Sequence, residues 1–299
     1  MKLNELLDGV ALAARHVQDV ECSGICCDTR DMTPGCLFVA LPGYKTDGHR
    51  YIRQALERGA AAVLCQRPPE GEGPWLVTED TRAALAIASA NWFGHPAREL
   101  TLLAVTGTNG KTTTTSMCTH IFLAAQRDPT VMIGGTLPAL GAGHRVGQGD
   151  TIILESCEYC NSFLSFFPTV AVILNIEADH LDFFKDLDDV EHSFRRFAEL
   201  VPADTGVVVA DRDDQNTMET LAGLERPLIT FGLEEGDVHA AGLEWVNGFP
   251  SFDIVFRGEK VTRVELQVPG EHNVRNALAA AAAANLCGAT AEPVSYTHL

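Results

Sequence analysis

Short apolar runs rich in β-branched residues recur along the chain, and segments of helical length separate several of them. The runs that we expect to be strands are residues 36–41, 61–65, 101–107, 130–135, 150–156, 169–176, 206–211 and 227–232. Segments 47–60 and 81–94 have the length and apolar spacing of helices. Continuous apolar runs such as "VAVILNI" (170–176) are typical of strands buried on both faces of a parallel sheet. The pattern therefore predicts an α/β protein with mainly parallel strands.

The pattern changes near the carboxyl end. Between residues 243 and 268, apolar and polar residues alternate, and the pairs Asn247-Gly248 and Arg257-Gly258 are typical turn sequences. We therefore expect antiparallel strands appended to the parallel sheet. The segment "PGEHNVRNALAAAAAANLCG" (269–288) then predicts a helix that ends at Gly288.

The segment "WFGHPARELT" (92–101) is the best candidate for a domain boundary. A helical pattern ends there at Gly94 and Pro96, and a polar link precedes the next apolar run. A length of 299 residues is sufficient for two compact domains. We expect a small amino-terminal α/β domain over residues 1–98 and a larger domain over residues 99–290.

The charge of the chain limits its partners. A formal net charge of −18 argues against general binding to nucleic acids or anionic membranes, which attract basic surfaces. The first 18 residues acquire Glu5 and Asp8 early and make a poor signal peptide. No apolar run approaches the roughly 20 residues of a membrane span. We expect a cytoplasmic protein with no nucleic-acid partner and no membrane insertion.

The nine cysteines do not predict a metal site. Cys157 and Cys160 form a single C-x-x-C pair, whereas a zinc site of this type needs two well-spaced pairs. A zinc or redox role for the pair is the less favoured alternative, and reduced thiols are expected.

The segment "TLLAVTGTNGKTTTTSMC" (101–118) predicts a phosphate-binding loop between a strand and a helix. Gly107 and Gly110 allow a tight turn and a close approach of the backbone to a phosphate. Lys111 can reach the β- and γ-phosphates, and the hydroxyl of Thr112 is placed to bind Mg²⁺. The alternative is a glycine turn with an exposed lysine. The expected ATP-binding residues of this loop are Gly107, Thr108, Asn109, Gly110, Lys111, Thr112 and Thr113.

Acidic residues follow two of the predicted strands. Glu155 comes directly after a buried strand, where an unpaired charge is unfavourable, so it is a candidate metal ligand. The segment "NIEADHLD" (175–182) supplies further carboxylates and His180. Its alternative interpretation is a solvated loop that caps the next helix. Because ligands collect at the carboxyl ends of parallel strands, both segments can lie beside the phosphate loop.

Four segments together resemble the Mur ligases, the ATP-dependent amino-acid-adding enzymes of peptidoglycan synthesis. They are "TGTNGKTTT" (106–114), "ILES" (153–156), "NIEADHLD" (175–182) and "PGEHNVRNALAA" (269–280). The resemblance covers nearly the whole chain. It implies a UDP-sugar-binding amino-terminal domain, a central P-loop ATPase domain and a carboxyl-terminal domain for the incoming amino acid.

The resemblance also implies roles for particular residues. Lys111, Glu155 and His180 would be catalytic, and Mg²⁺ would be held by Thr112, Glu155 and His180. Asn273 and Asn276 would lie near the adenine of ATP; their alternative role is a polar helix amino terminus.

The resemblance is divided between two branches of the family. Residues 1 to about 111, and most clearly 22–66, are similar to the branch that adds the third residue, lysine or diaminopimelate. There Asp28, Thr29, Arg30 and His49 would lie near the uridine nucleotide. From about residue 113 the chain is similar to the alanine-adding branch, in which Gly134, Gly135 and Thr136 are candidates for contacting the sugar-linked substrate.

The chain departs from each branch at one point. The alanine-adding branch opens with a G-x-G-x-x-G fingerprint, which is absent here. The third-residue branch uses a carbamoylated lysine in the helix after its D-H motif, where this chain has Arg195 and Arg196. Carbamoylation requires a neutral amine, which arginine does not offer. We expect an ADP-forming ligase that joins L-alanine to a UDP-N-acetylmuramate-type nucleotide sugar through an acyl phosphate, with lysine or diaminopimelate addition as the alternative.

The end of the chain, "EPVSYTHL", matches nothing expected of the family. We expect residues 291–299 to be a tail in place of the carboxyl-terminal ligase domain, and the chain to bind Mg²⁺ and ATP without completing ligation. The remaining alternatives are a non-catalytic ATP-binding fragment and another P-loop phosphotransferase, such as a kinase.

Overall fold

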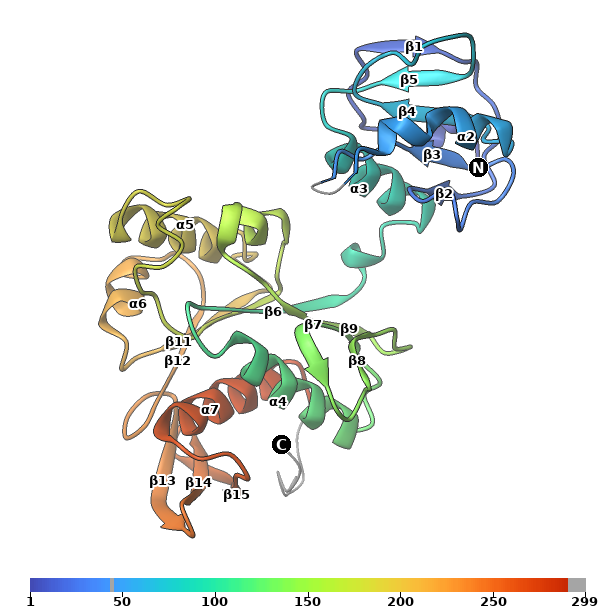
Figure 1. Cartoon of the computed structure of the whole chain (residues 1–299). Coiled ribbons are helices and arrows are strands. Elements are labelled where there is room, and N and C mark those ends of the chain that lie inside the picture. The colour runs from blue at the N-terminus through green and yellow to red at the C-terminus, as the bar shows by residue number, and fades with distance from the viewer. Residues whose placement is uncertain (44–45, 290–299) are drawn as a thin grey trace. The chain divides into compact units, whose positions relative to one another are not determined.

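The computed structural model describes residues 1–43 and 46–289. The chain divides into two compact units, Met1–Glu99 and Leu100–Leu299 (Figure 1). The predicted tail over residues 291–299 lies outside the described residues.

The first unit contains a five-stranded sheet in the order β1-β5-β4-β3-β2. All neighbouring strands are parallel except β1, which is antiparallel to β5. The strands are β1 (Ala14–His16), β2 (Ile25–Cys26), β3 (Leu37–Val39), β4 (Ala62–Cys65) and β5 (Trp75–Val77).

Helices cover both faces of this sheet. Successive residues of a strand point to opposite faces, so Leu37 and Val39 pack with the helices of one face and Phe38 packs with the helix of the other. The first face is covered by α1 (Leu3–Leu6) and α3 (Thr81–Trp92), and the second by α2 (Ile52–Glu57), which follows the 3-10 helix η1 (Gly48–Tyr51). A further 3-10 turn, η2 (Pro96–Arg98), ends the unit.

The second unit contains a ten-stranded sheet in the order β15-β14-β13-β12-β11-β10-β6-β9-β7-β8. Neighbours from β13 through β7 are parallel, and the strands added beyond them at both edges are antiparallel. The strands are β6 (Thr101–Thr106), β7 (Thr130–Leu137), β8 (Ala142–Arg145), β9 (Thr151–Glu155), β10 (Val170–Ile173), β11 (Val207–Asp211), β12 (Leu228–Gly232), β13 (Val238–Val246), β14 (Phe249–Phe256) and β15 (Glu259–Glu265).

Two helical layers bury this sheet. Helices α4 (Lys111–Ala124) and α7 (Glu271–Leu286) pack on one face, where the buried alanine run of α7 lets the two helices lie close together. Helix α5 (Leu187–Glu199), with α6 (Gln215–Thr220) and the 3-10 helix η3 (Tyr159–Ser165), covers the other (Figure 1). The central strands are therefore buried on both sides.

The predicted α/β class, with mainly parallel sheets and an appended antiparallel region, is confirmed. The antiparallel region begins earlier than expected, because β13 starts at Val238 and pairs in parallel with β12 before it turns into its hairpin. Both hairpin turns use a residue pair with positive φ, at Asn247-Gly248 and Arg257-Gly258.

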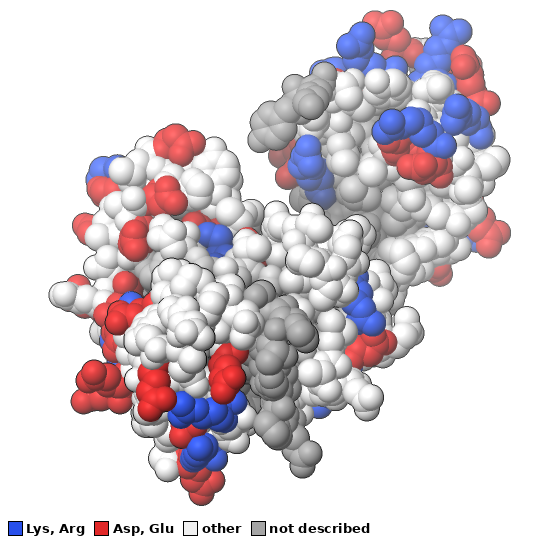
Figure 2. Space-filling model, turned by 60° about the horizontal axis from the view of Figure 1, so that its bottom comes forward, with Lys and Arg blue, Asp and Glu red and all other residues white. Residues whose placement is uncertain are grey.

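The surface agrees with the acidic composition. Figure 2 shows Asp and Glu side chains spread over the visible face of the second unit. Within the part of the chain that the structure describes, no helix combines the length and apolar character that a membrane crossing requires.

Candidate functional site

The loop between β6 and α4 has the backbone of a phosphate-binding turn. Gly107 has a φ of 140° and Gly110 a φ of 85°, in a region that favours glycine. A Cβ on Gly107 would lie 2.9 Å from the Cβ of Leu174, and one on Gly110 would lie 2.6 Å from Oδ1 of Asn276. Both positions therefore require glycine for their conformation and for their close packing. The loop ends at the amino terminus of α4, whose first N–H groups have no acceptor within the helix.

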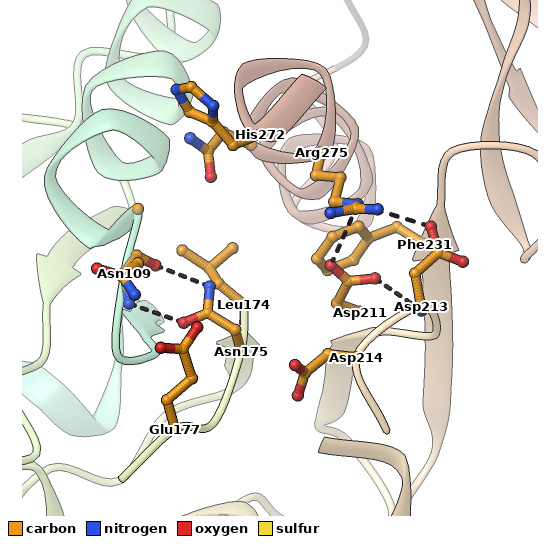
Figure 3. Close-up of a pocket in the computed structure, with 12 residues that line it drawn as sticks. Asn109, Leu174, Asn175, Glu177, Asp211, Asp213, Asp214, Phe231, His272 and Arg275 are labelled. Carbon is orange, nitrogen blue, oxygen red and sulfur yellow. Dashed lines mark hydrogen bonds and ion pairs between the residues drawn. The ribbon is translucent and has the colours of Figure 1, made fainter. Parts of the chain in front are cut away.

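The segment that follows β10 holds this loop in place. Asn175 accepts a hydrogen bond from the backbone N–H of Asn109 at its Oδ1 (2.7 Å) and donates one from Nδ2 to the carbonyl of Asn109 (3.1 Å) (Figure 3). The N–H of Thr108 donates to the carbonyl of Asn175 (3.0 Å), and the hydroxyl of Thr108 accepts from the N–H of Glu177 (2.9 Å). Asn175 belongs to a motif noted in the sequence, but its bracing role was not predicted.

Lys111 is folded over the loop and paired with a buried carboxylate. Its Nζ donates to the carbonyls of Gly107 (2.6 Å) and Thr108 (3.2 Å) and to Oε1 of Glu158 (3.1 Å). The side chain of Glu158 is only 2% exposed. Its Oε2 lies 3.0 Å from Nζ in an ion pair and accepts no further hydrogen bond from the described residues. Both carboxylate oxygens of Glu158 therefore lie within ion-pairing distance of the Lys111 amine.

Glu158, Asp179 and His180 form a group that fits a divalent cation. Each offers one ligand atom, and these atoms all lie within 4.8 Å of one another. Nε2 of His180 is 3.8 Å from Oε1 of Glu158 and 4.0 Å from Oδ2 of Asp179, too far for hydrogen bonds. Two carboxylates and one imidazole suit Mg²⁺ or Mn²⁺. Glu158 was not among the predicted residues; it lies three residues after Glu155, the last residue of β9, in a segment without a strand or helix pattern.

Glu155 contacts the other side of the phosphate loop. Its Oε1 accepts the hydroxyl of Thr112 (2.9 Å), and its Oε2 accepts the N–H of Gly134 (2.7 Å). A Cβ on Gly135 would lie 3.4 Å from Cγ2 of Thr112, and Thr136 is exposed further along β7. The structure thus brings Gly134 and Gly135 to the loop. The metal-binding roles predicted for Thr112 and Glu155 and the substrate contacts predicted for residues 134–136 stay predictions.

Two asparagines of α7 form a hydrogen-bonded chain that reaches the first turn of α4. Oδ1 of Asn276 accepts the hydroxyl of Thr114 (3.2 Å), and its Nδ2 donates to Oδ1 of Asn273 (3.2 Å). Nδ2 of Asn273 donates to the carbonyl of Pro269 (2.7 Å). Both side chains are buried, and Asn276 also lines the neighbouring cavity. Their predicted contact with adenine stays a prediction.

A cavity of about 410 Å³ opens beside the phosphate loop (Figure 3). It lies at the carboxyl ends of β6, β10, β11 and β12, which are neighbours in the sheet, and α7 forms another wall. Asn109 and Gly110 line both this cavity and the hollow over the loop itself, so the two spaces lie side by side. Leu174 and Phe231 supply apolar walls.

One wall of the cavity carries a charged group that sequence analysis missed. Nε of Arg275 lies 4.0 Å from Oδ2 of Asp211 and 3.6 Å from Oδ2 of Asp213, and it is buried without a hydrogen-bond acceptor among the described residues. Asp211 is itself buried and accepts the N–H of Asp213 (2.8 Å). Burial raises the pKa of Asp211 to about 6, although Arg275 opposes the shift.

The nucleotide-binding residues predicted in the first unit form two groups, residues 28–30 and His49. Arg30 donates hydrogen bonds to Asp28 in an exposed ion pair (2.6 Å), which lowers the pKa of Asp28 to about 2. Thr29 is buried and donates to Oε1 of Gln54 (3.0 Å). Residues 28–30 thus form one turn, and their nucleotide role stays a prediction.

The ring of His49 links two loops of the first unit through its two nitrogens. Its Nδ1 is 2.6 Å from Oδ1 of Asp47, and its Nε2 accepts the N–H of Gln66 (2.8 Å). Only 6% of the side chain is exposed. Both ring nitrogens are therefore engaged within the unit, and none of the contacts described for the chain joins His49 to residues 28–30.

Gly110→Ala should destabilise the second unit more than Gly141→Ala. Both glycines have positive φ, so both variants strain the backbone, but a Cβ at residue 141 meets nothing within 4 Å. The clash with Asn276 should add about 1–3 kcal/mol to the loss at residue 110. Urea unfolding of the two variants measures the difference, and equal losses would show that residue 110 is not closely packed.

Asp211→Asn should stabilise the protein increasingly as pH rises. The pKa of Asp211 is about 6 in the folded protein against an ordinary value of 3.8. The folded protein therefore binds the proton of this carboxyl group more tightly than the unfolded chain does. The stability from this group is fully present below about pH 3.8 and is lost as pH rises through about 6. The advantage of the asparagine variant should therefore grow between pH 4 and 7, up to about 3 kcal/mol.

Urea unfolding at several pH values measures this advantage, with Asp204→Asn as the exposed control. An advantage of Asp211→Asn that shrinks as pH rises would contradict the assignment.

Comparison with known proteins places this fold and site in one family. Residues 105–284 match the Mur ligase middle domain, and residues 21–98 match the Mur ligase family catalytic domain. The chain is 46% identical over 192 residues to a UDP-N-acetylmuramate–L-alanine ligase of Caldanaerobacter subterraneus subsp. tengcongensis, covering 64% of this chain and 42% of that protein. It is 46% identical over 182 residues to the ligase of that name from Clostridium novyi, covering 61% and 40%. The chain therefore spans less than half the length of these relatives.

Solved structures agree with this match. MurF from Acinetobacter baumannii superposes with a TM-score of 0.77 at 27% identity, covering 98% of this chain and 65% of that one. A UDP-N-acetylmuramoyl-L-alanyl-D-glutamate–2,6-diaminopimelate ligase gives a TM-score of 0.71 at 23% identity over 96% of this chain and 64% of that one, a likeness of fold alone. Together with the family match over the second unit, these findings show that the chain belongs to the Mur ligase family.

Proposed function

We propose that this chain belongs to an ATP-dependent, amide-forming ligase of peptidoglycan precursor synthesis, and that this ligase adds L-alanine to UDP-N-acetylmuramate. The observation that carries the proposal is the buried Lys111–Glu158 pair at the glycine loop, with His180 beside it. Family membership supports ligase chemistry, and the names of the 46% identical relatives support alanine and UDP-N-acetylmuramate as substrates.

ATP would bind with its phosphates on the loop and its base in the adjoining cavity. The N–H groups in the first turn of α4 and the positive end of that helix favour an anion, and Lys111 adds a full positive charge. The cavity of about 410 Å³ adjoins the loop, and Leu174 and Phe231 offer apolar contacts for a purine ring among its polar walls.

Magnesium fits two places beside this loop. Thr112 and Glu155 would hold one ion, and Glu158, Asp179 and His180 would hold another. The ions supply positive charge that offsets the negative charge of the transferring phosphoryl group. The burial of Glu158 and its position beside His180 support the second position.

The chemistry would proceed in two transfers. The γ-phosphoryl group of ATP passes to the carboxylate of UDP-N-acetylmuramate, which yields ADP and an acyl phosphate. The amine of L-alanine then attacks the acyl carbon, the C–O bond to phosphate breaks, and the amine loses a proton as the amide forms. Lys111 would turn its amine from the carbonyls of Gly107 and Thr108 to the phosphates, and with the first N–H groups of α4 it would stabilise the charge of the first transfer. Gly134 and Gly135, next to Glu155 and Thr112, would approach the acceptor sugar.

Helix α5 favours alanine over lysine or diaminopimelate as the added residue. Where the third-residue branch has its carbamoylated lysine, this chain has Arg195 and Arg196. Arg195 is engaged in an ion pair with Glu199 (2.8 Å) and in hydrogen bonds to the carbonyls of Thr220 and Ala222. It therefore serves to join α5 to the end of α6 rather than to carry a carbamate.

Lys111→Met should weaken ATP binding by on the order of 10- to 100-fold, because a charged hydrogen bond to phosphate is lost. The matched control is Lys185→Met, since Lys185 is an exposed lysine whose ion pair with Asp186 lies at the surface. Isothermal titration calorimetry with a non-hydrolysable ATP analogue measures both. Unchanged affinity in the Lys111 variant would contradict the phosphate role.

The Lys111 variant also leaves Glu158 buried without its ion-pair partner, which costs roughly 3–5 kcal/mol of stability. The double variant Lys111→Met/Glu158→Gln removes that charge. Its stability should recover while its ATP affinity stays low, which separates loss of binding from loss of fold.

UDP-N-acetylmuramate, and not its L-alanyl-D-glutamyl derivative, should be the acceptor that the protein phosphorylates. Incubation with ATP, Mg²⁺ and each acceptor should release ADP above background only with UDP-N-acetylmuramate. The carboxyl phosphate should be trapped by hydroxylamine as a hydroxamate. ADP release only with the dipeptide derivative would identify the third-residue ligase, and a stable phosphorylated hydroxyl would identify a kinase.

A further inference from the structure

Tyr159 contacts the loop that carries His180 but was not among the predicted site residues. It directly follows Glu158 and begins η3, in which Cys160 and Asn161 have φ values of 54° and 56°. Non-glycine residues with such angles are uncommon and are held by their surroundings. The chain thus turns sharply just after Glu158, and Tyr159 reaches the segment that follows β10.

The side chain of Tyr159 makes three contacts with residues 180–183. Its ring centroid lies 4.8 Å from that of His180 at an interplanar angle of 45°, and 6.0 Å from that of Phe183 in an edge-to-face arrangement. Its hydroxyl donates a hydrogen bond to Oδ2 of Asp182 (3.0 Å). The residue is 39% exposed, so burial in the core does not explain its position.

The imidazole of His180 depends on this contact for its orientation. The backbone of His180 is fixed, because its N–H donates to Asp179 (2.7 Å) and its carbonyl accepts from Phe183 and Phe184. The ring is not fixed in this way: its Nε2 lies 3.8 Å or more from Glu158 and Asp179. The Tyr159 ring is the aromatic neighbour that the structure records for His180.

The backbone strain of His180 gives the same conclusion. Its φ is 53°, a conformation that an L-residue adopts only when its surroundings compensate. The hydrogen bond from Tyr159 to Asp182 and the contact with Phe183 hold the turn that contains His180. Tyr159 therefore joins Glu158, its chain neighbour, to the loop that supplies the other two ligand atoms.

We propose that Tyr159 is a positioning residue whose ring holds the imidazole of His180 so that Glu158 and His180 face the same divalent cation. The inference rests on the proposed function, because it takes the group of Glu158, Asp179 and His180 as a cation site. It assigns no contact between Tyr159 and the cation or the substrates.

The test is manganese binding to the full chain, measured from the electron paramagnetic resonance signal of free Mn²⁺. Tyr159→Ala should weaken Mn²⁺ binding roughly three- to tenfold, because the aromatic contact that orients His180 is lost. Tyr159→Phe keeps the ring and should stay within about twofold of the unmodified protein. Phe167→Ala is the matched control, since Phe167 is an aromatic residue on the same segment and is 70% exposed.

A second readout follows the imidazole directly. The ¹H–¹³C resonance of the His180 ring, assigned by its loss in His180→Ala, should shift in Tyr159→Ala and remain nearly in place in Tyr159→Phe. A role in general folding alone would alter the melting temperature without this selective shift.

The outcomes distinguish the positioning role of Tyr159 from the existence of the cation site. If His180→Ala weakens Mn²⁺ binding but Tyr159→Ala does not, the positioning role is wrong and the cation site stands. Equal loss in Tyr159→Phe and Tyr159→Ala would also overturn the role assigned to the ring. If His180→Ala and Glu158→Gln both bind Mn²⁺ as the unmodified protein does, the cation site itself is wrong.

Discussion

The buried ion pair between Lys111 and Glu158 is the interaction on which the polar edge of the second unit depends. A carboxylate that is 2% exposed is unfavourable unless a positive charge lies beside it, and Lys111 supplies that charge at 3.0 Å. Such pairs rarely stabilise a protein more than apolar residues of the same volume would. The pair is therefore better explained by ligand binding. In the proposed function, a triphosphate would share the charge of Lys111 and leave Glu158 able to bind a cation, which would couple anion binding to metal binding.

The strand order explains why distant residues meet at this pair. β9, β6 and β10 are adjacent in the sheet and parallel, so their carboxyl ends lie at one edge. Glu158 follows β9, Lys111 follows β6, and His180 follows β10. Helix α7 then completes the site from far along the chain, because Asn276 hydrogen-bonds to Thr114 in the first turn of α4. The same edge thus holds the loop, the carboxylates and the cavity.

Parts of the structure with a strong local signal could be predicted from the sequence. The central strands are continuous apolar runs because they are buried on both faces, and the glycines of the phosphate loop are required by its backbone angles. The short strands β1 and β2 escaped prediction. Each has only two or three residues, none of them fully buried, and forms only because neighbouring strands provide hydrogen-bonding partners.

The site residues that were not predicted escaped prediction for a different reason. Glu158 lies in the segment "SCEYC", which has no strand or helix pattern, and its burial arises from packing against the phosphate loop and the loop after β10. Asp211 and Arg275 come from β11 and α7 and meet only in the folded sheet. Side chains such as these carry no local signature, since their environment is made by segments distant in sequence. Glu155, by contrast, was noticed because it ends a strand, and its metal role stays a prediction.

The most direct test of the account is a crystal structure with Mn²⁺ and a non-hydrolysable ATP analogue, in which anomalous scattering locates the manganese. We expect the triphosphate on the backbone of residues 107–113 with the γ-phosphate at Nζ of Lys111, and a manganese ion bound by Glu158 and His180. A triphosphate bound elsewhere, or manganese bound only by other carboxylates, would contradict it.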